Sequence, residues 1–265
     1  MGGRFEGRVA LITGASRGAG RAIALRLASE GADLVVTYKK EQGLAEEVVE
    51  AATGLGRRAV AVPADLELSG DVAQMFEVAR ARFARLDIFV ANAAATAFRP
   101  LLEVKDYNVT RTFAITVTAF VLAAQRAAAL MGDGFGRIVA VSGIDSVGVM
   151  PGHGVLGAAK AAMEMLVRYL AWELGPRGIT VNGVCPGLIE TDSYRMYVHQ
   201  GLGVDPAEAQ ARLIALTPRR RLGSPEDVAS LVAFLCSPEG DFLTGQTVIL
   251  DGGFSLLSPL GTVGG

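Results

Sequence analysis

Short apolar runs alternate along the chain with longer segments whose apolar residues recur at helical spacing. We expect helices near residues 18–30, 41–54, 69–85, 103–131, 153–174 and 225–237. The runs between them are continuously apolar, as is typical of parallel strands covered on both faces. This pattern predicts an α/β fold with one doubly wound parallel sheet. The expected strands are Arg8–Thr13, Asp33–Thr37, Ala59–Val62, Ile88–Ala91, Gly136–Ser142, Thr180–Val184 and Thr247–Leu250.

No linker, repeat or low-complexity segment divides the chain, so residues 1–265 are expected to form a single domain. Residues 187–224 form the longest stretch without a strand in the C-terminal half, and they contain two short helical patterns. In an open α/β sheet, a segment inserted after the carboxyl end of a strand can cover the ligand crevice. We therefore expect a small helical substrate lid at residues 187–224.

Charge and composition narrow the class of protein. Lys and Arg total 25 against 27 Asp and Glu, so nothing favours nucleic acid or an anionic membrane as a partner. No membrane span is expected, because the most apolar helical stretch, Thr112–Met131, is interrupted by Gln125 and Arg126. The two cysteines, Cys185 and Cys236, fit inert thiols in a reducing, cytoplasmic compartment. We expect no metal site.

Glycines cluster in the turn between the first strand and the first helix. Gly14, Gly18 and Gly20 follow a Gly-x3-Gly-x-Gly spacing, and the turn also contains Ser16 and Arg17. Such a turn lets the backbone approach a pyrophosphate at the N-terminus of the helix. The sequence therefore predicts a dinucleotide site here.

Five motifs, spread over nearly the whole chain, resemble in type and order those of the short-chain dehydrogenase/reductase superfamily. The resemblance implies a Rossmann-type fold in which Asp65 contacts adenine and Asn92 belongs to the cofactor site. It also implies a Pro186-Gly187 turn, followed by Thr191 at the nicotinamide carboxamide. The motifs are Thr13–Gly20, Asp65-Leu66, Ala91–Ala94, Asn182–Thr191, and Leu243–Gln246 with Asp251–Gly253.

The end of the second strand indicates which nicotinamide cofactor is used. An acid there would bind the ribose hydroxyls of NAD, but Val35–Lys40 contains none. Arg17 and Lys39 could pair with a 2′-phosphate, although both could instead be solvated surface cations. We expect NADP(H) as the cofactor.

The catalytic positions depart from the usual pattern of the superfamily, in which Ser, Tyr and Asn accompany a Lys. Lys160 fits, and it stands out because the chain has only four lysines. The Tyr position, four residues earlier, is Leu156, and the Ser position, seventeen residues earlier, is Gly143. Thr116 stands where the superfamily places its Asn.

His153 is the candidate replacement donor. The enoyl-thioester reductase branch of the superfamily places Tyr seven residues before Lys, and here that position is His153. A neutral imidazole, which a neighbouring Lys160 favours, or an imidazolium could stabilise an enolate oxygen. The alternative is that His153 is only a loop or N-cap residue. Weaker donor candidates are the loop residues Ser142, Asp145 and Ser146 and the lid residues Tyr194 and Tyr197.

Three functions remain open at this stage. The first is an NADPH-dependent reductase of an α,β-unsaturated acyl thioester, the second a ketoreductase of a polyketide or 3-oxoacyl substrate, and the third a redox-neutral or non-catalytic nucleotide-binding protein. Residues 219–221, all arginine, are expected to form a solvated face or, alternatively, to steer an anionic substrate carrier. The resemblance implies a homotetramer or homodimer formed through the helices near 103–131 and 153–174.

Overall fold

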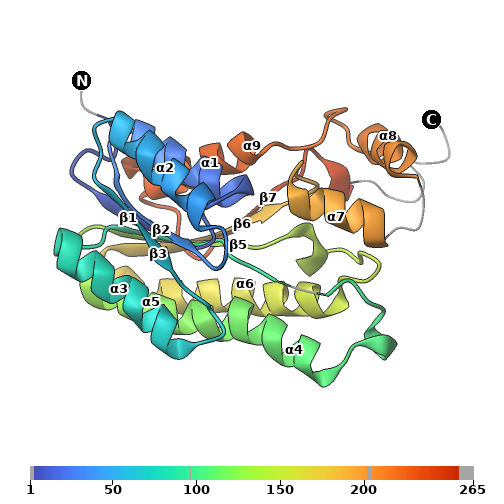
Figure 1. The fold of residues 1–265 in the computed structure, drawn as a ribbon, viewed down its shortest axis with the longest axis horizontal. Helices are drawn as coiled ribbons and strands as arrows, with labels where there is room; N and C mark the ends of the chain where they lie inside the picture. The colour runs from blue at the N-terminus through green and yellow to red at the C-terminus, as the bar shows by residue number, and fades with distance from the viewer. Residues whose placement is uncertain (1–2, 96, 202–204, 257–265) are drawn as a thin grey trace.

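Seven parallel strands form one sheet in the order β3-β2-β1-β4-β5-β6-β7 (Figure 1). The computed structural model describes residues 3–95, 97–201 and 205–256. All the predicted strands are confirmed, and β6 extends beyond its predicted end to Pro186. The strands are β1 (Val9–Ile12), β2 (Asp33–Tyr38), β3 (Ala59–Pro63), β4 (Ile88–Ala91), β5 (Gly136–Val141), β6 (Ile179–Pro186) and β7 (Thr247–Leu250).

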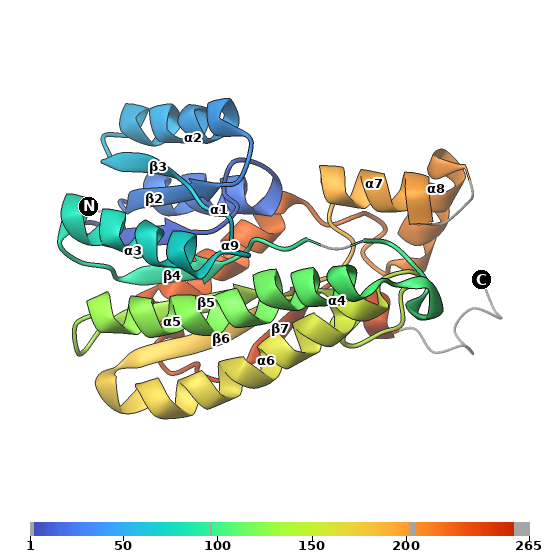
Figure 2. The same cartoon turned by 60° about the horizontal axis from the view of Figure 1, so that its bottom comes forward.

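Helices cover both faces of the sheet (Figures 1 and 2). One layer holds α1, α2 and α9, and the opposite layer holds α3, α5 and α6, with α4 leading into α5. The fold class predicted from the sequence is therefore confirmed. The helices on the sheet are α1 (Gly18–Ser29), α2 (Gln42–Gly54), α3 (Ser69–Phe83), α4 (Asp106–Phe113), α5 (Ala119–Leu130), α6 (Gly154–Leu174) and α9 (Pro225–Cys236).

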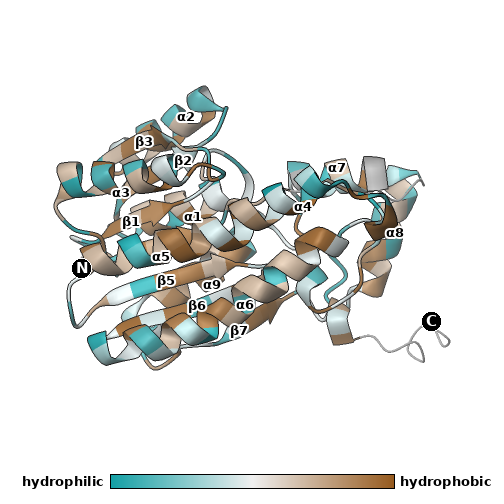
Figure 3. Ribbon diagram, turned by 90° about the horizontal axis from the view of Figure 1, so that it is seen from below, coloured by the Kyte–Doolittle hydropathy of each residue, from teal (hydrophilic) through white to brown (hydrophobic). Residues whose placement is uncertain are grey.

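The continuous apolar character of the strands follows from this double cover. In β1, Val9 and Leu11 join the core beneath α3, α5 and α6, whereas Ala10 and Ile12 join the core beneath α1 and α9. All four are at most 1% exposed. Successive residues of a strand point to opposite faces, so a strand buried on both sides has no position that faces solvent. Figure 3, coloured by the hydropathy of each residue, shows largely hydrophobic strands and hydrophilic stretches on α2 and α7.

The strand order reverses at β1, because β2 continues to one side of it and β4 to the other. In open α/β sheets, ligands bind outside the carboxyl ends of the strands at such a reversal. The glycine turn follows β1 and Asn92 follows β4, so both lie at this point.

The expected helix at 103–131 is interrupted. A short 3-10 helix at Leu101–Glu103 precedes α4, and a π-helical turn at Ala114–Thr118 separates α4 from α5. The segment Asp106–Leu130 is long and apolar enough to cross a membrane by length and composition. Its buried residues, such as Phe120 and Ala124, belong to the core beneath the sheet, so its apolar composition is that of a core helix.

The expected lid contains two helices, α7 (Asp192–Gly201) and α8 (Pro206–Leu216), as predicted. Both lie at the end of the sheet where β6 and β7 end (Figures 1 and 2). They share a small apolar cluster of their own, separate from the two main cores. Its buried members are Leu188, Tyr194, Val198, Ala209 and Leu222.

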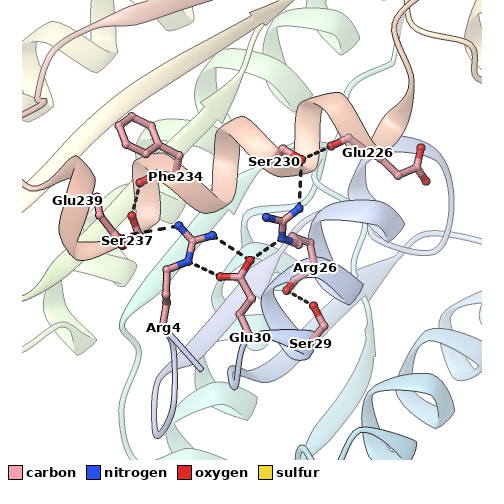
Figure 4. A network of polar contacts seen from close by, with 9 residues as sticks. All are labelled: Arg4, Arg26, Ser29, Glu30, Glu226, Ser230, Phe234, Ser237 and Glu239. Atoms are coloured by element: carbon pink, nitrogen blue, oxygen red, sulfur yellow. Dashed lines mark hydrogen bonds and ion pairs between the residues drawn. The ribbon is translucent and has the colours of Figure 1, made fainter. Parts of the chain in front are cut away.

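A polar network joins α1 to α9 and so fixes the helix that follows the glycine turn (Figure 4). Glu30 accepts hydrogen bonds from Nε of Arg4 and from Nε of Arg26, each at 2.5 Å. Arg26 also donates to Oγ of Ser230 on α9 at 3.1 Å. Burial raises the pKa of Glu30, but the hydrogen bonds from the two arginines outweigh it and hold the pKa below its usual range.

Candidate active site

The turn after β1 is tightly packed at its glycines. Gly14 and Gly18 have φ values of +63° and +55°, a conformation that favours glycine. A Cβ at Gly20 would lie 2.3 Å from the main-chain oxygen of Gly14 and 2.6 Å from Nδ2 of Asn92. The start of α1 therefore rests directly on the turn, and larger residues would force the two apart.

Asn92, just after β4, fastens the same turn. Its Nδ2 donates to the main-chain oxygens of Thr13 at 3.0 Å and Gly14 at 3.2 Å. Its main-chain N–H donates to Oγ1 of Thr13 at 3.0 Å. The side chain thus shapes the loop, and a direct contact between Asn92 and the cofactor stays a prediction.

The N-terminus of α1 provides acceptor-seeking N–H groups. Within the described part of the chain, Arg17 at the N-cap position makes no side-chain capping hydrogen bond. The helices α2, α3, α4 and α6 likewise lack one, whereas Asp205 caps α8 and Ser224 caps α9. The first N–H groups of a helix need acceptors, and phosphate oxygens are suitable ones. An uncapped helix that begins in a glycine turn therefore fits a dinucleotide pyrophosphate.

The loop after β6 borders the same turn. A Cβ at Gly18 would lie 3.6 Å from Cγ2 of Thr191. Gly187 packs against the end of β7, where its Cβ would lie 2.6 Å from that of Asp251. The fold thus brings the glycine turn, β4 and the loop after β6 to one edge of the sheet. The predicted cofactor residues at this edge are Gly14, Ser16, Arg17, Gly18, Gly20, Asn92, Pro186, Gly187 and Thr191.

The two expected phosphate partners are engaged by carboxylates. Nζ of Lys39 lies 2.7 Å from Oδ2 of Asp65 and 2.8 Å from Oε1 of Glu67. These hydrogen bonds raise the pKa of Lys39. Arg17 is half-exposed and lies 3.7 Å from Asp192 at the start of α7. A bound 2′-phosphate would compete with these acids. The sequence motifs did not indicate Glu67, which the structure places against Lys39.

Lys160 is buried on α6 beside the end of β5. Its Nζ donates to the main-chain oxygen of Val141 at 2.5 Å. Burial lowers its pKa from 10.5 to about 8, against the opposing charges of Asp145, Cys185 and Glu164. The burial argues against a surface lysine, which the sequence left open; the catalytic role assigned to Lys160 stays a prediction.

His153 occupies the N-cap position of α6, and the helix begins at Gly154. Its ring makes no capping hydrogen bond in the described structure. Instead, Nδ1 lies 3.1 Å from Oδ2 of Asp145, and the two side chains are only 12% and 6% exposed. The sequence left open an N-cap role. The position is that of an N-cap, but the imidazole is directed to a buried carboxylate.

Two aromatic rings enclose the imidazole of His153. The Phe98 ring lies 4.9 Å from it, and the Tyr197 ring of α7 lies 4.4 Å away in an edge-on arrangement. Nε2 of His153 is buried and has no hydrogen-bond partner among the described residues. Tyr194, by contrast, packs in the lid cluster, where its buried hydroxyl likewise lacks a described partner. Of the two lid tyrosines, Tyr197 is the one that contacts the candidate donor.

The two loop serines that were weaker donor candidates both bind a carboxylate on α6. Ser142 and Ser146 both donate to Oε1 of Glu164, at 2.5 and 2.6 Å. Their hydroxyls therefore support α6 from the loop after β5. Sequence reasoning missed Glu164, although its position one helical turn after Lys160 could have drawn attention to it. Burial raises the pKa of the neighbouring Cys185 thiol to about 11, in keeping with an inert thiol.

Thr116 stands in the π-helical turn between α4 and α5 and is fully buried. Its Oγ1 has no hydrogen-bond partner in the described part of the chain. Such turns often occur at functional sites. The irregular geometry falls at the position that the sequence assigned to the missing Asn.

Comparison with known proteins identifies the family to which this chain belongs. Residues 14–255 match the family model described as enoyl-(acyl carrier protein) reductase. The chain belongs to the short-chain dehydrogenase/reductase superfamily. It is 42% identical to the 1-cyclohexenylcarbonyl-CoA reductase of Streptomyces collinus, over 95% of this chain and 88% of that protein.

Solved short-chain dehydrogenase/reductase structures agree with the fold. A short-chain dehydrogenase from Burkholderia cenocepacia in complex with NADP has a TM-score of 0.86 at 38% identity, covering 95% of this chain and 99% of its own. An angucycline C-6 ketoreductase with bound NADP has a TM-score of 0.88 at 34% identity, covering 97% and 99%. The superfamily assignment made from the sequence motifs is confirmed.

Proposed function

We propose that this protein is an NADPH-dependent reductase of α,β-unsaturated acyl thioesters. The observation that carries the proposal is the arrangement around Lys160 and His153. The lysine lies beside the end of β5, and a single enclosed ring donor stands where the enoyl-reductase branch has Tyr. The match to the enoyl reductase family model and the similarity to 1-cyclohexenylcarbonyl-CoA reductase support it.

The residues at the sheet edge fit NADP(H). The uncapped start of α1 would hold the pyrophosphate, Arg17 and Lys39 the 2′-phosphate, and Lys160 the nicotinamide ribose. The related structures with NADP support this choice of cofactor. When bound, the dihydronicotinamide supplies a hydride to the substrate.

The anion that forms on hydride transfer differs between the two candidate substrates, and one imidazole donor is enough for the anion of an enoyl thioester. Hydride addition to the β-carbon of an enoyl thioester leaves an enolate, whose charge is delocalised over oxygen and carbon. Reduction of a ketone leaves an alkoxide, which is more basic and requires a complete proton transfer. A hydrogen bond from His153 to the thioester oxygen would stabilise the enolate. With Leu156 and Gly143 in place of Tyr and Ser, the site suits the less demanding reaction.

Keto reduction is the second candidate function. The similarity to an angucycline C-6 ketoreductase favours it. In that case His153 must deliver a full proton to the alkoxide, as Tyr does in the usual pattern. The two functions therefore differ in how strongly the rate depends on the protonation of His153.

Following NADPH absorbance with a crotonyl thioester and with an acetoacetyl thioester tests both functions. We expect oxidation with the enoyl substrate. Oxidation with the keto substrate alone would favour the ketoreductase, and absence of NADPH binding would overturn both and leave the non-catalytic alternative. Lys160→Ala should weaken NADPH binding, and His153→Ala should lower turnover. Full activity of His153→Ala would remove the donor role.

We further propose that copies of the chain associate through α6. Met165, Tyr169 and Trp172 share one face of this helix and are 47%, 62% and 84% exposed. An exposed aromatic stripe at helical spacing is typical of an interface. Sedimentation of the wild type against Trp172→Glu tests this, with a dimer or tetramer expected for the wild type.

Two buried free thiols, Cys185 and Cys236, accord with a reducing cytoplasmic compartment.

A further inference from the structure

The position where the superfamily usually has its catalytic Ser is filled by the carboxylate of another residue. Gly143 has φ −172°, an extended conformation open to any residue, so backbone geometry does not require glycine there. A Cβ at Gly143 would lie 2.6 Å from Oδ1 of Asp145. A side chain at 143 would therefore displace this carboxylate, which occupies the volume into which the side chain would project.

Asp145 is held in this place from several sides. Its Oδ2 is 3.1 Å from Nδ1 of His153, and its side chain is 6% exposed. Its main-chain oxygen faces α6 so closely that a Cβ at Gly157 would lie 2.3 Å from it. A buried carboxylate needs charged or hydrogen-bonding partners. Asp145 has the imidazole of His153, and its charge also acts on Lys160.

We propose that Asp145 is a positioning residue that stands in for the missing Ser and orients His153 as the proton donor. The carboxylate accepts the Nδ1–H of the imidazole, which fixes the ring and leaves Nε2 free for the substrate. This role rests on the proposed reduction at the same site. It adds a His-Asp pair to a fold that otherwise uses Ser and Tyr.

The pairing decides which form of His153 donates. In the neutral imidazole that Asp145 stabilises, the hydrogen is on Nδ1 and Nε2 has none. The donor is therefore the imidazolium, which carries a hydrogen on each ring nitrogen and can keep its Nδ1–H on Asp145 while Nε2–H faces the substrate. In the step, the Nε2–H bond breaks, its electron pair stays on Nε2, and the proton joins the enolate oxygen to form an enol. The α-carbon of the enol then takes a proton from solvent and the oxygen releases its proton to solvent, which gives the saturated thioester. Asp145 remains ionised, and solvent returns a proton to Nε2.

Among the described residues, the charged group in contact with the imidazole of His153 is Asp145, and its other ring contacts are aromatic. Phe98 reaches it from the loop after β4, and Tyr197 reaches it from α7. Burial raises the pKa of Tyr197, which keeps its hydroxyl protonated. Lys160, further along α6, is a cation and so opposes the imidazolium. The sequence left both forms of the donor open, a neutral imidazole, which Lys160 favours, and an imidazolium; the pairing of Nδ1 with Asp145 favours the imidazolium.

A double-mutant cycle between positions 143 and 145 tests the space argument. With NADPH and a crotonyl thioester, Asp145→Ala should lower kcat by about 10²-fold. Gly143→Ser should lower it by about tenfold or more, because its Cβ displaces the carboxylate. In the Asp145→Ala background, Gly143→Ser should cause no further loss, while KM and the NADPH Kd stay within about twofold of the wild type. Additive losses, or an unchanged kcat in Asp145→Ala, would overturn the proposal.

Two further variants separate positioning from folding. Gly148→Ala lies on the same loop, where the nearest atom to the new Cβ would be 3.7 Å away, and it should behave as the wild type. Asp145→Asn keeps the shape of the side chain but loses its charge, so it should fold normally and still lose kcat. Full activity of Asp145→Asn would also overturn the proposal, because an amide cannot stabilise the imidazolium in this way.

A spectroscopic readout separates this proposal from the proposed function. In protein labelled with ¹⁵N-histidine, His153 and His199 are the two histidines, and His153→Phe assigns them. We expect the neutral ring of His153 to be the Nδ1–H tautomer in the wild type and to lose that preference in Asp145→Ala. If neither thioester is reduced but the tautomer changes as expected, the proposed function fails and the pairing stands. An unchanged tautomer in Asp145→Ala overturns the pairing whatever the activity.

Discussion

Nζ of Lys160 donates its hydrogen bond to the main-chain oxygen of Val141, the last residue of β5. The bond joins α6 to the sheet at the carboxyl edge, where the predicted cofactor residues lie. Lys160 is only 4% exposed, so the bond buries an ammonium group. The cost of burying this charge is visible in its lowered pKa of about 8.

Lys160 should make stability depend on pH. Its pKa is 10.5 in the unfolded chain and about 8 in the folded protein. Between these values the unfolded chain binds more protons, so the free energy of unfolding should rise with pH, by at most about 3 kcal/mol. Lys160→Met should lack this rise. Urea unfolding of both proteins near pH 7 and pH 9 checks it, and a difference between them that does not change with pH would contradict it.

Gly157→Ala should impair both folding and turnover. Its Cβ would lie 2.3 Å from the main-chain oxygen of Asp145, so the loop after β5 must move away from α6. We expect a loss of about 1–3 kcal/mol in unfolding free energy, despite the better helix propensity of Ala. Gly43→Ala on α2 is the control, because its Cβ would meet nothing within 4 Å and the change should be neutral or stabilising. Equal effects of the two variants would contradict the close packing.

Tyr197 should act through its ring. The ring lies 4.4 Å from that of His153, so Tyr197→Phe preserves the enclosure while removing the hydroxyl. We expect Tyr197→Phe to keep kcat within about threefold and Tyr197→Ala to lose about tenfold, since a loosened donor is misplaced. Steady-state kinetics at saturating NADPH compare them. A large loss in Tyr197→Phe would instead point to the lid tyrosine as the proton donor.

Arg17 should discriminate NADPH from NADH. The half-exposed guanidinium lies at the N-terminus of α1, and its ion-pair partner among the described residues is Asp192, at 3.7 Å. A charge-assisted contact with a 2′-phosphate is worth about 1–3 kcal/mol, so Arg17→Ala should weaken NADPH binding about tenfold and leave NADH binding unchanged. Fluorescence titration with both cofactors measures this. Arg21→Ala, one turn further along α1, is the control, and equal losses for both cofactors would argue against a phosphate contact.

Glu30 should contribute stability that disappears in acid. Its pKa is held below 4.5, so its stabilising effect is present above that value and is lost as the pH falls through the folded pKa. Glu30→Gln should cost about 1–2 kcal/mol at neutral pH, because Arg4 and Arg26 lose a charged acceptor. Unfolding curves at neutral and acidic pH test this, with Glu47→Gln on the exposed face of α2 as the control. Equal destabilisation at both pH values would contradict the assignment.

Many of the site residues could be predicted because they follow regular elements. The glycine turn directly follows β1 and precedes α1, and Lys160 lies on a helix after a glycine-rich loop. Local spacing along the chain is enough to identify such features. By contrast, Glu67 and Glu164 belong to none of the five sequence motifs, and their places depend on contacts with Lys39 and with the loop serines, which lie far from them in the chain.

The sequence alone determined the doubly wound sheet, the glycine turn after β1, the two helices within residues 187–224, and the departures at Gly143 and Leu156. Each depends on periodicity or on residues close together in the chain. The tertiary structure decided that Asp145 fills the space at Gly143 and holds His153, and that Phe98 and Tyr197 enclose the imidazole. These contacts join a loop, a helix start and a lid that meet only when the sheet and its helices pack, so no local pattern specifies them.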